Sequence, residues 1–478
     1  MDQAKAAALN QIDAISNLIC HMSDAIWDAP ELAFHEHQAV RIQMDTLKQL
    51  GFEDIRTQLC NIPTAFSARW GSGKPVIGFL GEFDALPNLS QQAGVSKKSP
   101  IVPDGSGHGC GHHLLGSGSI AAAYAVKEYL RVTGKPGTVV YFGCPAEENG
   151  SGKAFMARDG IFDELDLALT WHPGNTTEVW SDSTLANFAV RYRFKGVSAH
   201  ASGAPHLGRS ALDAVELMNV GVQFLREHVP TTVRMHYAIT DAGGNAPNVV
   251  QPNAEVYYLL RAPSVPLVQE VYERVNDIAR GAALMTGTKE TIEFVKCASN
   301  TLPNWTLNRV LGSNLHAVSL PELTQEELDL AQAFYDSKEN SEDPYAEILP
   351  RLTVEEQEWV KSQKLYPMCQ CVLPAFHDHR SSKGSSDVGD TSWATPTAQI
   401  RVATNACNIT NHTWQATAMG KSSIAHKGML FAGKVLAASA IDLINDPDTV
   451  AKARAEYKQL LGGKPFVSPL PKDIKPRL

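Results

Sequence analysis

Three apolar segments in the first part of the chain are each followed directly by residues that can bind a metal or carry a proton. Residues 75–80, 138–144 and 165–170 are short and rich in β-branched, aromatic or other apolar side chains, which is typical of buried strands. Polar residues at the carboxyl ends of such strands are characteristic of open parallel sheets. We therefore expect an α/β fold with a parallel or mixed sheet flanked by helices. Helical patterns cover residues 11–26, 36–50 and 115–131, and the polar residues that follow the strands are Glu82, Asp84, Glu147, Glu148 and His172.

The composition is that of a folded globular protein, and it indicates neither a nucleic-acid-binding nor a membrane protein. The chain has 478 residues, of which 44% are hydrophobic, and a formal net charge of -9. It contains no dense block of lysine and arginine, and no apolar stretch approaches the roughly 18 residues of a membrane span. Residues 1–10 carry no apolar run of the kind found in signal peptides. We expect a cytoplasmic enzyme that binds neither nucleic acid nor membrane.

The middle of the chain changes to a different pattern, with order β-α-β-β-α-β. This order predicts an inserted ferredoxin-like domain over residues 184–299, within a catalytic domain made of residues 1–183 and 300–478. The expected strands cover residues 185–195, 232–240, 254–261 and 290–297, and the expected helices cover residues 210–227 and 265–286.

The stretch from residue 320 to residue 364 is acidic and helical. Two segments, residues 324–327 and 353–356, have the Thr-x-x-Glu pattern that starts helices. We interpret this stretch as a surface insertion without a catalytic role, and the pair Cys369 and Cys371 that follows it as structurally incidental. The α/β pattern then returns with a strand at 398–403 and a long helix at 423–443.

A set of metal-type ligands is spread along the proposed catalytic domain. Thiolate, imidazole and carboxylate side chains hold zinc-like and manganese-like ions, and a Glu-Glu pair can offer one carboxylate to a metal and the other as a general base. Each residue alone is more often structural, but their common position at the ends of strands and helices favours metal binding. The glycine-rich segment 105–111 lacks the lysine of a phosphate loop. The candidate ligands are Cys110, His112, Glu148 and His172, followed by either His412 or His426.

The chain resembles the M20 metallopeptidase and amidohydrolase family. The resemblance runs essentially from end to end, and it is greatest to the branch that contains N-acyl-amino-acid hydrolases and the aminobenzoyl-glutamate utilisation proteins B. The segments that carry it are WDAPEL at 27–32, GEFDAL at 81–86, HGCGH at 108–112, CPAEE at 144–148, WHP at 171–173, FKG at 194–196 with His200, PNVVQ at 247–251 and SIAHKGM at 423–429.

The resemblance implies a site for two divalent metal ions, manganese or zinc, in each protomer. Cys110 stands where other members have an aspartate that bridges the ions, and Glu82 stands where they have a ligand histidine, which puts a ligand role for Glu82 in doubt. Glu147 would be the general base, and Asp84 would orient a ligand histidine. The implied metal ligands are Cys110, His112, Glu148, His172 and His412, with His412 preferred to His426 because Asn411-His412-Thr413 fits the family's last motif.

The resemblance also implies that the inserted domain forms a homodimer and covers the active site. His200 would reach the active site of the partner protomer and support the oxyanion. Asn248 and Arg261 would hold the substrate's carboxylate, for which the guanidinium fork of arginine is well suited. Asp387 is a weaker candidate near the site.

Three functions remain open at this level. The first is an amidohydrolase that cleaves p-aminobenzoyl-glutamate or a similar N-acyl amino acid, and the second is a dipeptidase or broad aminoacylase. The third is a subunit that needs a related partner chain, or a metal-dependent scaffold. The pair Glu147 and Glu148 argues against a scaffold without catalytic activity.

Overall fold

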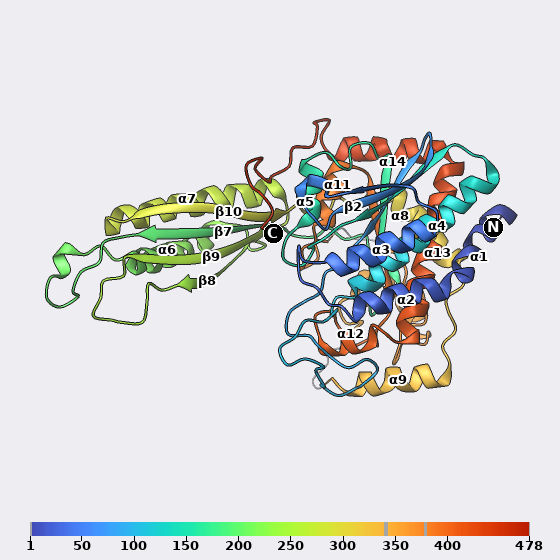
Figure 1. The fold of residues 1–478 in the computed structure, drawn as a ribbon, viewed down its shortest axis with the longest axis horizontal. Helices are drawn as coiled ribbons and strands as arrows, with labels where there is room; N and C mark the ends of the chain where they lie inside the picture. Colours follow the sequence, from blue (N-terminus) through green and yellow to red (C-terminus); the bar gives the residue numbers. More distant parts are fainter. Residues whose placement is uncertain (1, 339–342, 377–379, 478) are drawn as a thin grey trace.

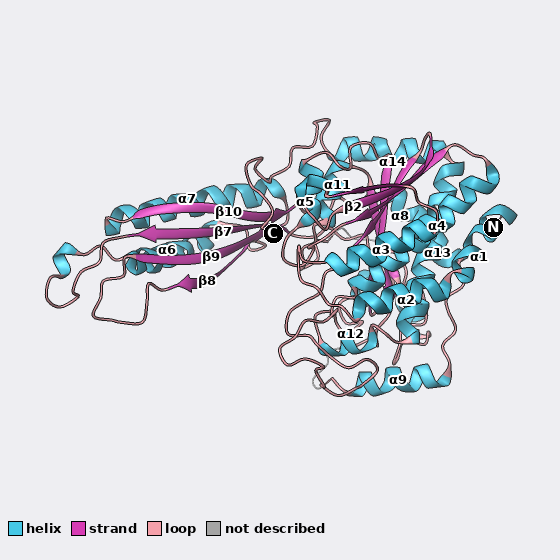
Figure 2. Cartoon of the chain, viewed as in Figure 1, coloured by secondary structure: helices cyan, strands magenta, loops and turns pink. Residues whose placement is uncertain are grey.

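The larger of two sheets has the predicted mixed character and carries helices on both faces (Figures 1 and 2). The structure is a computed structural model that describes residues 2–338, 343–376 and 380–477. Seven strands form this sheet in the order β1-β2-β4-β3-β5-β11-β6. The four strands in its middle are parallel and are β4 (Gly137–Gly143), β3 (Val76–Gly81), β5 (Leu167–Gly174) and β11 (Thr397–Ala403). The antiparallel strands outside them are β1 (Asp54–Thr57), β2 (Phe66–Ser72) and β6 (Glu178–Val179).

Strand β5 extends further than the sequence pattern predicted. Its parallel ladder with β11 continues through His172, which pairs with Arg401, to Gly174. His172 therefore lies inside the strand rather than after it. The alternation of a strand directs this imidazole to one defined face of the sheet.

Helices cover one face of the large sheet with an extensive apolar core. Strand residues such as Ile77, Phe79 and Leu169 point into this core and are fully buried. The predicted helix at 11–26 is in fact two helices, because Ile15 leaves helical geometry with φ -103° and ψ 8°. The helices that contribute to this core are α1 (Gln3–Ala14), α2 (Ser16–Trp27), α3 (His37–Gln49), α4 (His112–Thr133), α8 (Trp305–Ala317), α13 (Ser423–Asn445) and α14 (Pro447–Leu460).

Helices α4 and α13 approach each other closely because small residues line their contact. A Cβ atom on Gly118 would lie 2.9 Å from Trp171 Nε1 and 3.0 Å from the Met429 carbonyl oxygen. Any larger side chain there would push the helices apart.

Among the described residues, α13 is the one helix long and apolar enough to cross a membrane by length and composition, and 78% of its apolar window is buried in the core.

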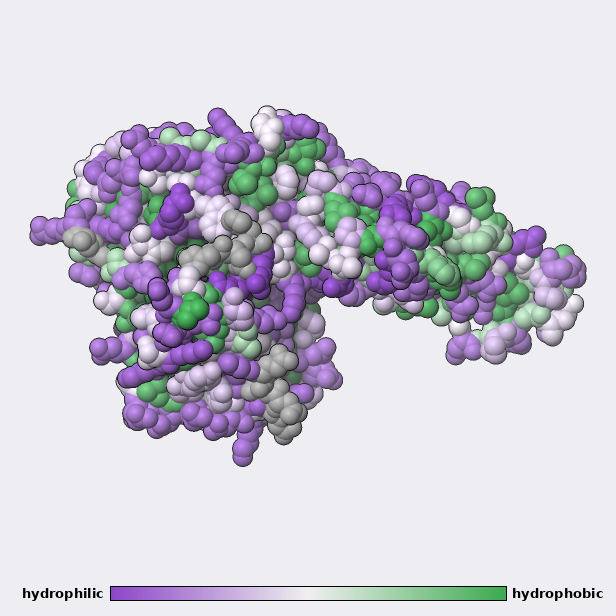
Figure 3. Space-filling view, turned by 180° about the vertical axis from the view of Figure 1, so that it is seen from behind, coloured by the Kyte–Doolittle hydropathy of each residue, from purple (hydrophilic) through white to green (hydrophobic). Residues whose placement is uncertain are grey.

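The opposite face of the large sheet is continuous with a second lobe. Helices α5 (Gly152–Arg158) and α11 (Val388–Ala394) pack on this face, and its apolar residues form one cluster with the core of the smaller sheet. Figure 3 shows this lobe projecting from the larger body of the molecule. The two lobes therefore share a packed core where they meet.

The smaller sheet has the topology that the sequence pattern predicted. Its strand order is β10-β7-β9-β8, which in chain order is 4-1-3-2 of a ferredoxin-like fold. Helices pack against one face, and the side chains on the other face are mostly polar. The strands are β7 (Ala186–Lys195), β8 (Arg234–Asp241), β9 (Asn253–Ala262) and β10 (Lys289–Ala298), and the helices are α6 (Ala211–Leu225) and α7 (Val265–Thr286).

The acidic stretch after residue 320 forms two helices on the surface of the larger lobe. Both begin with the predicted capping boxes, at Thr324 with Glu327 and at Thr353 with Glu356. The helices are α9 (Gln325–Asp336) and α10 (Val354–Lys361). The absence of a catalytic role for this stretch stays a prediction.

Candidate active site

The candidate ligands meet at the carboxyl edge of the four parallel strands. The segment that follows β3 carries Glu82 and Asp84, the segment that follows β4 carries Glu147 and Glu148, and β5 carries His172. Parallel strands end at one edge of a sheet, so these side chains converge there, as the sequence pattern predicted. The remaining ligands arrive from the amino end of α4, with Cys110 and His112, and from the loop after β11, with His412.

A strained turn directs the Glu-Glu pair into this edge. Ala146 has a left-handed backbone with φ 60°, which a residue with a Cβ adopts only when its surroundings impose it. Its amide donates a 2.8 Å hydrogen bond to Oε1 of Glu36, a fully buried residue at the start of α3. Burial, together with the charge of Asp84, raises the pKa of Glu36 to about 8. Glu36 therefore holds the turn that positions Glu147.

His112 is held in one orientation by Asp84. Its Nδ1 lies 2.7 Å from Asp84 Oδ1, and the other oxygen of Asp84 accepts a 2.9 Å hydrogen bond from the backbone amide of Glu148. With Nδ1 engaged, Nε2 is the atom left to face the site. This contact agrees with the orienting role expected for Asp84.

Cys110 and His172 lie together on one side of the site. The distance from Cys110 Sγ to His172 Nε2 is 3.6 Å, and His172 Nδ1 lies 2.7 Å from the Pro173 carbonyl oxygen. That carbonyl can only accept, so Nδ1 carries the proton and Nε2 presents its lone pair to the site. The amide of Asn411 lies 3.7 Å from Cys110 Sγ and 3.2 Å from the Pro173 carbonyl. Burial, and next the charge of His112, lowers the pKa of His172 to about 4, so its imidazole is neutral at physiological pH.

His412, rather than His426, lies beside the proposed ligand Glu148. His412 Nε2 is 3.2 Å from Glu148 Oε1, whereas His426 in α13 forms a 2.8 Å contact with Asp24 of α2. Burial tends to raise the pKa of Glu148, but the adjacent imidazole of His412 and the charge of His112 lower it overall. The geometry therefore favours His412 as the last ligand.

Two triplets of donor atoms share the thiol of Cys110. The first is Cys110, His112 and His172, and the second is Cys110, Glu148 and His412. Within each triplet the donor atoms all lie within 4.8 Å of one another. Cys110 Sγ therefore lies close enough to both pairs of donor atoms to bind an ion together with either pair.

Two donor atoms of these triplets lack a hydrogen bond of their own. His112 Nε2 and Glu148 Oε1 are buried without a properly directed hydrogen bond, although Glu82 and His412 lie only 3.1 Å and 3.2 Å away. Burial and the charge of Glu148 raise the pKa of the Cys110 thiol, so a cation is needed to hold it as a thiolate. The donor set of one sulfur, imidazoles and a carboxylate fits zinc or manganese.

Glu82 is engaged by a lysine that the sequence analysis did not single out. Lys153, at the start of α5, is fully buried, and its Nζ lies 2.7 Å from Glu82 Oε1 and 2.5 Å from Asp387 Oδ1. The second oxygen of Glu82 is 3.1 Å from His112 Nε2. Glu82 thus forms an ion pair beside the ligands. Asp387, a weaker candidate in the sequence, is a fixed part of this network.

Glu147 lies among carboxylates. Burial, and then the negative charges of Glu82, Glu148 and Asp387, raises its pKa well above the ordinary value. A carboxyl group whose protonated form is stabilised in this way is suited to accept and return a proton during a reaction.

The structure separates the candidate residues of the smaller lobe. Arg261, at the end of β9 nearest the large sheet, donates a 3.4 Å hydrogen bond from Nη1 to Ser385 Oγ. His200 and Asn248 lie in the loops after β7 and β8, at the end of the lobe remote from the ligands (Figure 1). There they are exposed neighbours, joined by the His200–Val249 bridge and by a hydrogen bond from the Ala201 amide to the Asn248 carbonyl. Within one chain, Asn248 and Arg261 therefore do not form a single carboxylate site.

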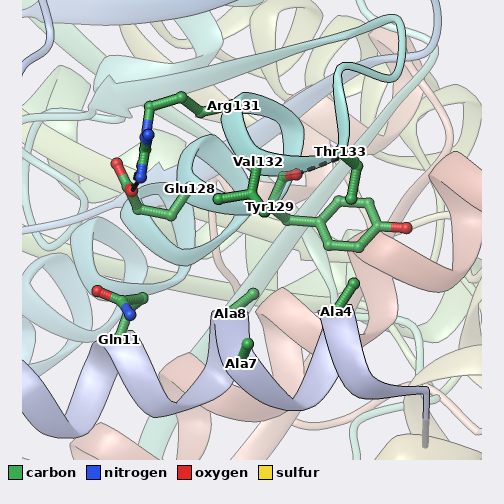
Figure 4. Close-up of a pocket in the computed structure, with 9 residues that line it drawn as sticks. All are labelled: Ala4, Ala7, Ala8, Gln11, Glu128, Tyr129, Arg131, Val132 and Thr133. Carbon is green, nitrogen blue, oxygen red and sulfur yellow. Dashed lines mark hydrogen bonds and ion pairs between the residues drawn. The ribbon is translucent and has the colours of Figure 1, made fainter.

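A separate cavity of about 60 Å³ lies between α1 and the end of α4 (Figure 4). Its lining includes three alanines and the ion pair of Glu128 with Arg131. None of the nine residues drawn around it belongs to the ligand set. The candidate metal ligands lie at the strand ends instead, so this cavity is not part of the candidate site.

Residues 78–473 match the model of a protein family described as peptidase family M20/M25/M40. This chain belongs to that family. Members of the M20 family are metal-dependent hydrolases of amide bonds, and this chain is such a hydrolase.

Two curated relatives of this M20 protein match it over nearly its whole length. The chain is 44% identical over 476 residues to the B chain of p-aminobenzoyl-glutamate hydrolase from Escherichia coli (strain K12), with 97% of each chain covered. It is 28% identical over 475 residues to Xaa-Arg dipeptidase of Mus musculus, with 96% of this chain and 93% of the relative covered. The predicted family is thereby confirmed.

Solved structures of low sequence identity share the fold of this M20 chain. A putative aminohydrolase from methicillin-resistant Staphylococcus aureus has a TM-score of 0.62 at 18% identity, covering 93% of this chain and all of the other. A dinuclear metal-binding peptidase of the M20 family from Bacillus subtilis has a TM-score of 0.53 at 17% identity, covering 89% and 98%. These similarities establish the fold alone.

Proposed function

We propose that this M20 hydrolase cleaves the amide bond of p-aminobenzoyl-glutamate or a closely related N-acyl amino acid. The observation that carries the proposal is the pair of ligand triplets that share Cys110, with Glu147 beside them. The 44% identity to one chain of a p-aminobenzoyl-glutamate hydrolase, over 97% of both sequences, supports this choice of substrate.

Five side chains would hold two divalent ions, manganese or zinc. His112 and His172 would bind one ion, Glu148 and His412 the other, and Cys110 both, which follows the two triplets. When bound, such ions supply Lewis-acid chemistry, because they polarise a carbonyl group and lower the pKa of a water molecule. The hydrogen bond of Asp84 to His112 and that of His172 to the Pro173 carbonyl fix the imidazoles for this purpose.

Glu147 is the group that would move protons during the reaction. Its carboxylate takes a proton from the attacking water and passes it to the nitrogen of the leaving amine. Burial and the neighbouring carboxylates favour its protonated form after the first transfer, which suits the second transfer. Glu36 and the turn at Ala146 hold the carboxylate in place while this happens.

The smaller lobe would contribute to the site in two ways. Arg261 would bind the substrate's α-carboxylate, because its guanidinium is half-buried and bonds only to the hydroxyl of Ser385 among the described residues. The loops after β7 and β8, which carry His200 and Asn248, lie at the end of the smaller lobe away from the large sheet (Figure 1), which supports a homodimer in which these residues complete the active site of the partner protomer.

Two alternatives follow from the relatives. The identity to an Xaa-Arg dipeptidase over nearly the full length supports a dipeptidase as the second candidate. The A chain of p-aminobenzoyl-glutamate hydrolase from Escherichia coli (strain K12) is 27% identical over 49% of this chain, which supports a hetero-oligomer with a related chain.

The Cys110 thiol would require a reducing compartment, consistent with the cytoplasm.

The experiment incubates the purified, manganese-loaded protein with p-aminobenzoyl-glutamate, p-aminobenzoyl-glycine and an Xaa-Arg dipeptide, with a chelator-treated control. We expect the protein to release glutamate from p-aminobenzoyl-glutamate faster than it cleaves the other two substrates, and we expect the chelator to abolish this release. Faster cleavage of the dipeptide would support the dipeptidase instead. If the folded, metal-loaded protein cleaves none of them alone but becomes active when a related chain is added, it is one part of an obligatory hetero-oligomer.

A further inference from the structure

Lys296 lies on the face of the small sheet that α6 and α7 leave uncovered. In the ladder register it pairs with Ala189 of β7, which in turn pairs with Leu259 of β9. Two residues along β7, Asn187 pairs with Arg261. Residues two apart on a strand share a face, so Lys296, Ala189, Asn187 and Arg261 face the same side of the sheet. All four lie at the end of the sheet nearest the ligands.

A β-bulge sets the direction of Lys296. The register of β10 against β7 shifts between Phe294 and Lys296, so that one residue is left unpaired. Bulges of this kind redirect a side chain and are common beside active sites. Without the shift, the alternation along β10 would turn Lys296 toward the opposite, helix-covered face, where Phe294 packs in the apolar core.

The side chain of Lys296 is half-buried. No hydrogen bond or ion pair joins it to any residue in the described parts of the chain. Burial lowers its pKa, although the charges of Glu147 and then Asp387 act in the opposite direction. A desolvated cation without a direct partner is costly, which makes an anionic ligand the natural partner.

Two neighbours of Lys296 also have unused polar atoms. Asn187 is only 7% exposed, and its Oδ1 is buried without a hydrogen bond. Its amide can turn to present either the oxygen or the NH2 group. Arg261 has a buried Nε without a partner, and only its Nη1 is engaged, by Ser385. The three polar groups come from three adjacent strands, and the residue on this face between Lys296 and Arg261 is the small Ala189.

We propose that Lys296, with Asn187 beside it, forms a second anion subsite that binds the side-chain carboxylate of a dicarboxylic leaving amino acid. The inference rests on the proposed function, in which Arg261 takes the α-carboxylate of the same amino acid. From the strand spacing, the Cα atoms of Lys296 and Arg261 are about 12 Å apart, because two strand spacings of about 4.8 Å combine with one two-residue step of about 7 Å. Two long side chains across this distance can grip the two carboxylates of one glutamate or aspartate. Lys296 is therefore a specificity residue for the acidic side chain.

The test compares p-aminobenzoyl-glutamate with p-aminobenzoyl-glutamine, which has the same shape but a neutral side chain. The metal-loaded native protein should prefer the glutamate substrate by at least about tenfold in kcat/KM. The Lys296→Met variant should lose about tenfold to a hundredfold on the glutamate substrate, the usual effect of one hydrogen bond to a charged group, and less than about threefold on the glutamine substrate. Lys296→Arg, which keeps the charge, should retain a preference for glutamate.

The matched control is Lys289→Met, which removes the same charge from the exposed, opposite end of β10. It should leave both substrates unaffected. An equal loss on both substrates in Lys296→Met, or no loss on either, would overturn the subsite.

Failure of the proposed function is recognised separately, because the native protein would then hydrolyse neither substrate. In that case calorimetry with free glutamate and glutamine tests the subsite directly. Weaker glutamate binding in Lys296→Met, by about tenfold or more, with unchanged glutamine binding, supports it. Equal binding of glutamate by the two proteins would overturn it.

Discussion

Removing the buried cation at Lys153 should destabilise the protein more than removing any exposed lysine. Its Nζ lies 2.7 Å from Glu82 and 2.5 Å from Asp387, and the side chains of all three residues are at most 2% exposed. Lys153→Met leaves both carboxylates buried without their cation. Breaking a buried ion pair by removing one partner costs about 3–5 kcal/mol, so we expect a loss of about 4 kcal/mol in the free energy of unfolding.

The matched control is Lys48→Met, which removes a lysine from a surface pair with Asp45. The atoms of that pair are 3.4 Å apart, and the side chains are 61% and 65% exposed. Such pairs contribute about 0–1 kcal/mol. Urea unfolding of the metal-free proteins, followed by tryptophan fluorescence and circular dichroism, gives both values.

The pH dependence of the Lys153→Met deficit provides an internal check. Without Lys153, burial raises the folded-state pKa values of Glu82 and Asp387 above the unfolded values of about 4. The folded variant then binds more protons than the unfolded chain, so its stability falls as pH rises above about 4. The deficit should be small at pH 4 and largest near pH 8. A deficit below about 1 kcal/mol at pH 8, equal to that of Lys48→Met, would refute the reasoning.

Three further predictions concern the turn and the ligands. The pKa of Glu36 is raised to about 8 in the folded state, so the free energy of unfolding of the metal-free native protein should decrease as the pH rises from about 4.5 to about 8. Glu36→Gln keeps an acceptor for the Ala146 amide but cannot titrate, so urea unfolding of this variant should show a smaller decrease. Cys110→Ala should reduce bound manganese or zinc below two ions per chain in elemental analysis, while Cys110→Asp should bind more metal than Cys110→Ala, and full metal loading of Cys110→Ala would remove Cys110 from the ligand set. His412→Ala should lower metal content to about one ion per chain and His426→Ala should not, and the reverse result would exchange their roles.

The sequence predicted the parts of the fold that depend on local pattern. Alternation and apolar runs identified the central strands, and the β-α-β-β-α-β order predicted the ferredoxin-like sheet. The outer strands β1 and β2 were missed, because several of their residues are exposed and their pairing is decided by contacts far away in the chain. The break at Ile15 was missed because the helical periodicity continues through it.

The candidate site shows the same division between local and long-range information. Cys110, His112 and Glu148 could be selected from the sequence because metal-type side chains recur at the ends of several predicted strands and helices, although each residue alone is more often structural. Lys153 was not predicted, because a lysine in the first turn of a helix is ordinarily exposed and only the fold reveals its burial. Lys296 was missed for a related reason, because its direction depends on a β-bulge that cannot be predicted from the local sequence pattern.

The central claim is that Glu147 transfers the proton at a site for two metal ions, both of which Cys110 would bind. The most direct measurement is glutamate release from p-aminobenzoyl-glutamate by Glu147→Gln, with metal content measured in the same samples. The account predicts two ions per chain, as in the native protein, and a rate reduced at least about a thousandfold, consistent with loss of general acid–base catalysis. A fully metallated Glu147→Gln protein that releases glutamate at a near-native rate would contradict it.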